Sequence, residues 1–332
     1  GNVPRFLLII MNRLAGHGVL ISTLRGKLYQ PFKSDVRVGR KQLEDMGAMD
    51  LQVEYSGGVI DAMHFLSTSQ SPMSQRTMIF FPGMGDAYER FGIWGIAEEN
   101  LLLQYQRAGF NVILWNYPDV INSTGSPSLH NITEAAAAII RLLIEEYKVP
   151  EKDLLIHAHS MGGGIATYFV TQRDAEGNLK YPEISLCNDR SFSSLKKAIK
   201  CHTDALLPIP SSKIGELAGK FVSDVCKWNL ATIEVWNPPD ARGYYWCIHN
   251  ISDVTIPHKA SLAYALRKQD RDTDRIIELS PYNEFNWGTE IRNYNELHSS
   301  PCHDRPLYRD EWEQQLIHLR IAFPDIASSI DT

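Results

Sequence analysis

The stretch Leu154–Val170, which reads LLIHAHSMGGGIATYFV, joins a short apolar run to a segment of helical character through a serine. Ser160 has Ala158 two residues before it and Gly162 two residues after it. Strand, sharp turn and helix in this order are the context of a G-x-S-x-G nucleophile elbow, with alanine in place of the first glycine. Small neighbours let the strand and the helix approach closely, and the strained turn exposes the hydroxyl group. We therefore interpret Ser160 as a catalytic nucleophile. The alternative is a glycine-rich helix start that packs or cradles phosphate, but no G-K-[ST] pattern accompanies it.

Short apolar runs alternate with longer helical segments through most of the chain. Runs of this length, bounded by Gly, Pro, Asn or Asp, are typical of a largely parallel sheet covered on both faces. The runs are TMIFF, NVILW, LLIHA, ISLCN, YYWCIHN and RIIEL. Before them, LQVEY and VIDAMHFL flank Gly57 and Gly58, which predicts a hairpin at an antiparallel edge of the sheet. The fold class is therefore α/β, with a mostly parallel central sheet.

Two helices carry recognisable start and stop signals. Asn131 followed by Glu134 resembles a capping box that opens a helix ending before Pro150. Near the end of the chain, Asp310 is expected to cap a last helix that closes at Pro324. Both helices should pack on the sheet.

The chain is expected to form a helical arm over residues 1–50 and one hydrolase-like domain over residues 51–332. Residues 193–237 interrupt the alternation with mixed helical segments and no strand-like run, so we interpret them as a helical cap inserted over the active face. The arm is basic and apolar, which is typical of a segment that contacts a membrane surface.

Backbone amides that stabilise an oxyanion are expected on either side of Ser160. The run MIFFPGMG ends a strand in a glycine-rich turn, from which the amide of Met84 can point at a developing negative charge. The amide of Met161 follows the nucleophile directly and supplies a second donor.

A catalytic acid and base should follow the serine in the order Ser, Asp, His. Asp253 stands at the end of a predicted strand, where catalytic loops gather, and is preferred over Asp189 as the acid. His303 and His298 both lie on the loop before the last helix, and spacing favours His303 as the base. His157 and His159 are interpreted as residues that pack or that support the site from behind it, and His249 and His258 as structural residues.

Charge and cysteine content argue against nucleic acid as a partner and against a metal site. With 33 Lys and Arg against 39 Asp and Glu the net charge is −6, so no positive field favours nucleic acid. Five cysteines without C-x-x-C spacing argue against a disulfide framework or a zinc site, and no H-E-x-x-H motif occurs. The longest N-terminal apolar stretch, Phe6–Met11, is too short to span a bilayer and has no signal-peptide cleavage site after it. We expect no metal, no organic cofactor, and no signal peptide or transmembrane helix; the oligomeric state is not indicated.

Five segments in order carry a family resemblance: FFPGMG, NYPDVINSTGSPS, HAHSMGGGIA, LCNDRSFSSL and HNISDVTIP. Over about Met78–Phe323 the chain resembles the α/β-hydrolase superfamily and is similar to the chlamydial CHLPS-type (DUF818-like) bacterial hydrolases, which include secreted effector-like proteins of intracellular bacteria. Ala158 and Asp119 depart from the pattern at positions that bear on substrate preference. The resemblance implies a Ser-His-Asp hydrolase that needs no cofactor, located in the cytoplasm or secreted into a host cell.

Three functions are compatible with these residues. The leading hypothesis is hydrolysis of a carboxylic ester in a small-molecule, lipid or acylated substrate. A peptidase or thioesterase would use the same triad, because one fold hosts many substrates. A catalytically silent hydrolase fold that serves as a binding module is the third.

Overall fold

A computed structural model provides the structure of the chain. It describes residues 33–67, 76–83, 86–93, 100–206, 212–220, 222–223, 228–253, 255–279, 303, 305–307 and 309–328. The predicted apolar arm segment Phe6–Met11, the oxyanion candidate Met84 and the alternative base His298 therefore lie outside the described residues.

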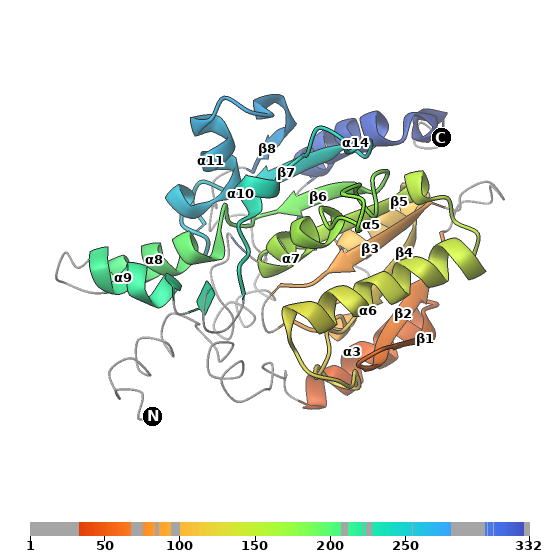
Figure 1. Cartoon of the computed structure of the whole chain (residues 1–332). Helices are drawn as coiled ribbons and strands as arrows, with labels where there is room; N and C mark the ends of the chain where they lie inside the picture. The colour runs from red at the N-terminus through yellow and green to blue at the C-terminus, as the bar shows by residue number, and fades with distance from the viewer. Residues whose placement is uncertain are drawn as a thin grey trace, which may run out of the picture.

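An eight-stranded sheet forms the centre of the molecule (Figure 1). The strands are β1 Met49–Tyr55, β2 Gly58–Phe65, β3 Thr77–Phe81, β4 Asn111–Trp115, β5 Leu154–His159, β6 Ser185–Asp189, β7 Tyr245–His249 and β8 Ile276–Glu278. Their order is β1-β2-β4-β3-β5-β6-β7-β8. Strands β1 and β2 pair antiparallel, β2 pairs antiparallel with β4, and every later pair is parallel. The predicted mostly parallel sheet with an antiparallel edge is confirmed.

The burial of each strand explains why the apolar runs in the sequence predicted the strands. Strands β3, β5, β6 and β7 are buried at every position, as expected for parallel strands covered on both faces. Strand β1 lies at the edge of the sheet and is exposed at several positions. The turn between β1 and β2 consists of two residues, and Tyr55 pairs with Gly58 across it, so the predicted hairpin is also confirmed.

Helices cover both faces of the sheet and divide the apolar interior into two cores. Their bounds are α3 Lys33–Asp45, α4 Glu89–Ile93, α5 Leu101–Arg107, α6 Leu129–Arg141, α7 Met161–Val170, α8 Leu195–Leu206, α9 Ser212–Lys220, α10 Thr232–Val235, α11 Leu262–Lys268 and α14 Arg309–Ala322. Helices α6, α7 and α11 pack on one face, and α6 and α7 lie across the front of the sheet in Figure 1. Helices α3, α4, α5 and α14 contribute to the core on the other face. Successive residues of each strand therefore enter opposite cores, as with Phe80 and Phe81.

Two predicted helix starts were wrong by a few residues. Helix α6 begins at Leu129, and its N-cap is Ser128, whose hydroxyl accepts a hydrogen bond of 3.1 Å from the amide of Asn131. Asn131 is thus the residue whose amide is capped and not the cap itself, because the extended backbone ends at Ser128, three residues earlier. Helix α14 begins at Arg309, so Asp310 lies inside its first turn, where a carboxylate interacts favourably with the helix dipole.

Helices α8, α9 and α10 occupy the chain between β6 and β7. Helices α8 and α9 pack on each other and extend away from the sheet on the left of Figure 1. Among the described residues between 195 and 235, no strand occurs. Cys187 and Cys247 are buried in strands, and their thiols form no disulfide. No helix among the described residues has the length and apolar character needed to cross a bilayer.

Candidate active site

Ser160 sits on a sharp turn between β5 and α7. Its backbone has φ 55° and ψ −120°, a left-handed conformation that residues with a side chain rarely adopt. Such a conformation costs about 1–3 kcal/mol and persists only where the surroundings enforce it. The Ser160 amide donates a hydrogen bond of 2.9 Å to the carbonyl of Asp189 at the end of the neighbouring strand. The turn is therefore held by the sheet itself, and Ser160 is 8% exposed at the sheet's carboxyl edge.

Three consecutive glycines let α7 approach its neighbours more closely than side chains would allow. A Cβ atom on Gly162 would lie 2.3 Å from the carbonyl oxygen of Phe81, at the end of β3. One on Gly163 would lie 2.6 Å from the side chain of Ser191, and one on Gly164 would lie 2.7 Å from the ring of Phe192. The glycines after the serine thus bring the start of α7 into backbone contact with the turn that follows β3.

Gly83, in the turn after β3, packs close to Ser160. A Cβ atom on Gly83 would lie 3.2 Å from the Cβ of Ser160 and 3.2 Å from Nδ1 of His159. The hydroxyl of Tyr117 donates a hydrogen bond of 2.9 Å to the carbonyl of Pro82, which fixes the entry to this turn. Met161 is the first residue of α7 and is buried, so its amide belongs to the free amides of a helix start.

Asp253 and His303 meet although 50 residues separate them. Nδ1 of His303 lies 2.6 Å from Oδ2 of Asp253, and both side chains are almost fully buried. The other carboxylate oxygen of Asp253 accepts hydrogen bonds from the amides of Thr255 and Ile256, at 2.8 and 2.9 Å. Three bonds fix the orientation of this carboxylate, and it in turn fixes the ring of His303.

His159 connects His303 to the turn that carries Ser160. Nε2 of His159 lies 2.9 Å from the carbonyl oxygen of His303, and the two rings are 4.7 Å apart between centroids. Because His159 immediately precedes Ser160, this contact brings His303 next to the elbow. The sequence predicts that His159 either packs or supports the site from behind, and its contact with the carbonyl of His303 is of the second kind.

Asp189, the alternative acid, faces other partners. Its carboxylate forms two hydrogen bonds of 2.7 Å with the guanidinium of Arg190 and lies 3.4 Å from Nε2 of His157. Burial raises the pKa of a carboxyl group, but at Asp189 the charge of Arg190 and the hydrogen bond from His157 outweigh burial and hold its pKa well below the usual range. The carboxylate of Asp189 is therefore a fixed anion beneath the elbow, whereas the carboxylate that contacts His303 is that of Asp253.

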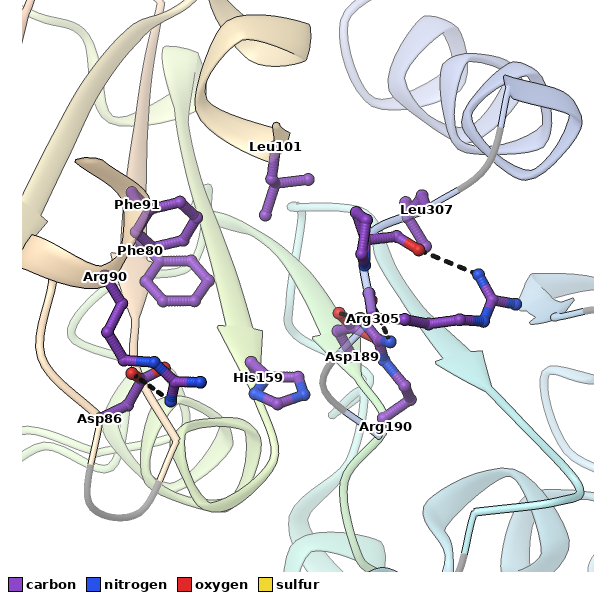
Figure 2. Close-up of a pocket in the computed structure, with 11 residues that line it drawn as sticks. Phe80, Asp86, Arg90, Phe91, Leu101, His159, Asp189, Arg190, Arg305 and Leu307 are labelled. Carbon is purple, nitrogen blue, oxygen red and sulfur yellow. Dashed lines mark hydrogen bonds and ion pairs between the residues drawn. The ribbon is translucent and has the colours of Figure 1, made fainter. Parts of the chain in front are cut away.

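A small cavity of about 40 Å³ lies beside the elbow, on the side to which His159 points (Figure 2). Phe80, Phe91 and Leu101 line one part of it and Leu307 another. Its three arginines are each paired with a carboxylate: Arg90 with Asp86, Arg190 with Asp189, and Arg305 with Glu311. The cavity therefore presents an apolar wall and neutralised charges. Among the described residues, no group of three or more metal-ligating side chains occurs.

A histidine pair lies just behind Asp253. Nε2 of His249 is 3.0 Å from Nδ1 of His258, and His249 is buried at the end of β7. The pKa of His249 is lowered to about 4, chiefly by burial; the nearby His258 and Arg267 add to the decrease, and the charges of Glu278 and Asp253 oppose it. Between pH 4 and the ordinary histidine value of about 6.5, the unfolded chain therefore binds a proton at this residue that the folded chain does not.

This difference predicts a pH dependence of stability. The contribution of His249 is complete above pH 6.5 and is lost as the pH falls toward 4, so wild type should lose roughly 2.5 kcal/mol of unfolding free energy through this residue between pH 7 and pH 4.5. His249→Gln, which cannot be protonated, should be less sensitive to acid by that amount in urea titrations at the two pH values. An identical acid-induced loss in both proteins would contradict the assignment.

The sequence analysis did not identify every residue that shapes the site. For Tyr117 a weak signal existed, because it is a polar residue just past a predicted strand. Arg305 and Glu311 form a buried ion pair at 2.5 Å that neither residue type nor spacing indicated. Such pairs depend on which loops meet above the sheet, and a single sequence does not reveal that.

The described geometry can be compared with known proteins. The family described as Chlamydia CHLPS protein (DUF818) matches residues 27–230. The chain is 32% identical over 89 residues to human phosphatidylserine lipase ABHD16A, a match that covers 26% of this chain and 14% of the lipase. It is 25% identical over 148 residues to the multifunctional-autoprocessing repeats-in-toxin protein of Vibrio vulnificus, which covers 45% of this chain and 3% of the toxin. The chain thus spans a small fraction of the length of both relatives.

Solved structures share the fold over most of the chain. An α/β hydrolase from Vibrio vulnificus has a TM-score of 0.56 at 15% identity, covering 89% of this chain and 93% of its own. An esterase from Pyrococcus furiosus has a TM-score of 0.50 at 15% identity, covering 90% of this chain and 98% of its own. With the sheet order described above, these similarities identify the α/β-hydrolase fold.

Proposed function

Because this chain belongs to the Chlamydia CHLPS protein (DUF818) family and has the α/β-hydrolase fold, we propose that it is a serine hydrolase that cleaves carboxylic esters. Ser160 is the nucleophile, His303 the general base and Asp253 the residue that orients the base. The observation that carries the proposal is the 2.6 Å contact between Asp253 and His303, with His303 bonded in turn to the residue before Ser160.

The chemistry follows from these positions. Oγ of Ser160 attacks the ester carbonyl while its proton passes to Nε2 of His303, the ring nitrogen that Asp253 does not contact. The carbonyl oxygen becomes an oxyanion, which the amides of Met161 and Met84 stabilise. Collapse of this intermediate breaks the bond to the alcohol, which takes the proton from His303 and leaves an acyl group on Ser160. Water, deprotonated by His303, then releases the carboxylic acid.

The proposed substrate is an acyl ester, either a lipid or a small acylated molecule. The human relative is named a phosphatidylserine lipase and one structural neighbour is an esterase, which supports esters over peptides. The apolar wall of Phe80, Phe91 and Leu101 beside the elbow also suits an uncharged acyl substituent.

Labelling with a fluorophosphonate probe, followed by peptide mapping, tests the proposal. We expect a single modified residue, Ser160, and hydrolysis of p-nitrophenyl esters by the unlabelled protein. Labelling at another serine would overturn the nucleophile assignment. Absence of both labelling and hydrolysis would favour a silent binding module, and cleavage of thioesters or peptides in preference to esters would replace the proposed substrate class.

A further inference from the structure

A buried charged cluster lies behind the turn that follows β3. Arg40 on α3 contacts Asp61 on β2, the hydroxyl of Tyr88 and the carboxylate of Glu89, the last at 3.3 Å. Tyr88 also donates a hydrogen bond of 3.2 Å to Asp61, and Nδ2 of Asn116 lies 3.1 Å from Glu89. We call these five residues the Arg40 cluster. It joins α3, β2, the residue that follows β4 and the start of α4, and nothing in the ester cleavage outlined above uses it.

Helices α3 and α4 are in backbone contact at the cluster. A Cβ atom on Gly39 would lie 2.0 Å from the carbonyl oxygen of Glu89, and one on Gly92 would lie 2.0 Å from the carbonyl oxygen of Gly39. The two helices therefore cross where neither has a side chain. This close crossing places the guanidinium of the next residue, Arg40, against the first turn of α4.

The Arg40 cluster is linked through Asn116 to the backbone beside Ser160. Nδ2 of Asn116 lies 3.1 Å from Glu89, and its side-chain oxygen accepts a hydrogen bond of 3.1 Å from the amide of Tyr88. The hydroxyl of the next residue, Tyr117, donates a hydrogen bond to the carbonyl of Pro82. A Cβ atom on the adjacent Gly83 would lie only 3.2 Å from the Cβ of Ser160. Movement of Asn116 would therefore shift the backbone of Pro82 and Gly83 beside the proposed nucleophile.

The charges of the cluster depend on Arg40. Burial raises the pKa of Glu89, and Asp61 adds to the rise, whereas Asn116 and Arg40 oppose it. Burial alone would lower the pKa of Arg40, but its bond to Asp61 and the charges of its neighbours raise it. Without the guanidinium, two buried carboxyl groups would face each other with no cation between them, which favours separation of α4 from β2.

We propose that Arg40 is a positioning residue for Pro82 and Gly83, the backbone that packs against Ser160, so that α3 supports the active site of the hydrolase. The inference rests on the proposed function, because it assigns Arg40 a role in holding the backbone beside the nucleophile that this chemistry needs. Arg40 does not touch the reacting atoms; it acts through Glu89 and Asn116, and from there through Tyr117, which holds Pro82.

The test compares Arg40→Met with Lys41→Met. Lys41 is the next residue of α3 and forms an exposed ion pair with Asp45, so its replacement removes a cation from the same helix without touching the cluster. Saturating fluorophosphonate labelling counts the competent sites, and kcat for a p-nitrophenyl ester is expressed per labelled site. We expect Arg40→Met to lower kcat per site roughly 10- to 100-fold with KM within about threefold, because a shift of the backbone beside the nucleophile weakens interactions that form mainly in the transition state. Lys41→Met should match wild type.

Arg40→Lys is the control for a simple folding defect. Lysine keeps the positive charge but lacks the planar guanidinium that contacts three partners, so an intermediate kcat is expected. If Arg40 only stabilised the fold, labelling would count fewer sites and kcat per site would equal that of wild type in both variants. That result would overturn the inference.

Hydrogen exchange separates this inference from the proposed function. Peptides covering residues 78–93 should exchange faster in Arg40→Met than in wild type or Lys41→Met. If exchange is unchanged, Arg40 does not hold the turn, whatever the activity. If exchange rises but wild type shows neither labelling at Ser160 nor hydrolysis, Arg40 still holds the turn, and it is the proposed catalysis that fails.

Discussion

Ser160→Ala is expected to lower the rate of ester hydrolysis at least about 10⁴-fold, because the oxygen that forms the acyl intermediate is removed while the rest of the site stays in place. Labelling by the fluorophosphonate probe should disappear completely. Alanine keeps the Cβ atom and the same left-handed backbone, so the unfolding free energy should stay within about 1 kcal/mol of wild type.

A matched serine elsewhere in the sheet serves as the control. Ser185 begins β6, at the opposite end of that strand from the elbow, and its hydroxyl accepts a hydrogen bond of 3.1 Å from the amide of Tyr244. Ser185→Ala should lose some stability through that bond and retain labelling and kcat. Labelling of Ser160→Ala at the wild-type level would show that another residue is the nucleophile. Residual turnover above a hundredth of wild type would point the same way.

The sheet was predictable from the sequence because parallel strands buried on both faces read as short apolar runs. All six runs after the hairpin correspond to strands β3 to β8, and the hairpin corresponds to β1 and β2. The elbow was predictable for a related reason. Its small residues, Ala158 and Gly162, stand at fixed positions around Ser160, so local spacing alone indicated the turn.

Helix starts were less predictable, since several residues close together in the sequence can each serve as the N-cap. Asn131 and Ser128 are both good caps, and only the backbone conformation decides between them. The start of α14 differs from prediction for the same reason: Asp310 suits both the cap and the first turn.

The Arg40 cluster was beyond prediction from one sequence. Arg40, Asp61 and Glu89 are 21 to 49 residues apart, and each alone has the character of an ordinary surface charge. What brings them together is the crossing of α3 and α4 at two glycines, which no periodic pattern reveals. Predicted catalytic residues were easier to find because the chain order of the acid and the base is restricted.

Replacement by asparagine should mainly lower the catalytic rate at Asp253 and mainly lower the stability at Asp189. Asp253→Asn removes the charge that orients His303 and stabilises its protonated form, so kcat should fall roughly 10⁴-fold while the fold is kept. Asp189→Asn leaves the buried guanidinium of Arg190 without its carboxylate, which should cost about 3–5 kcal/mol of unfolding free energy. Molecules that remain folded should keep kcat per labelled site within about tenfold of wild type, because the contact between Asp253 and His303 is intact.

The pH dependence of the stability loss distinguishes the Asp189 ion pair from the effect of His249. Since the pKa of Asp189 is held well below its usual range in the folded chain, its stabilising effect is complete above the unfolded value of about 3.9 and fades only in stronger acid. Asp189→Asn should therefore be destabilised by the same amount at pH 5 and pH 8, measured by urea unfolding. A kcat loss per labelled site in Asp189→Asn, with Asp253→Asn active, would transfer the role of catalytic acid to Asp189.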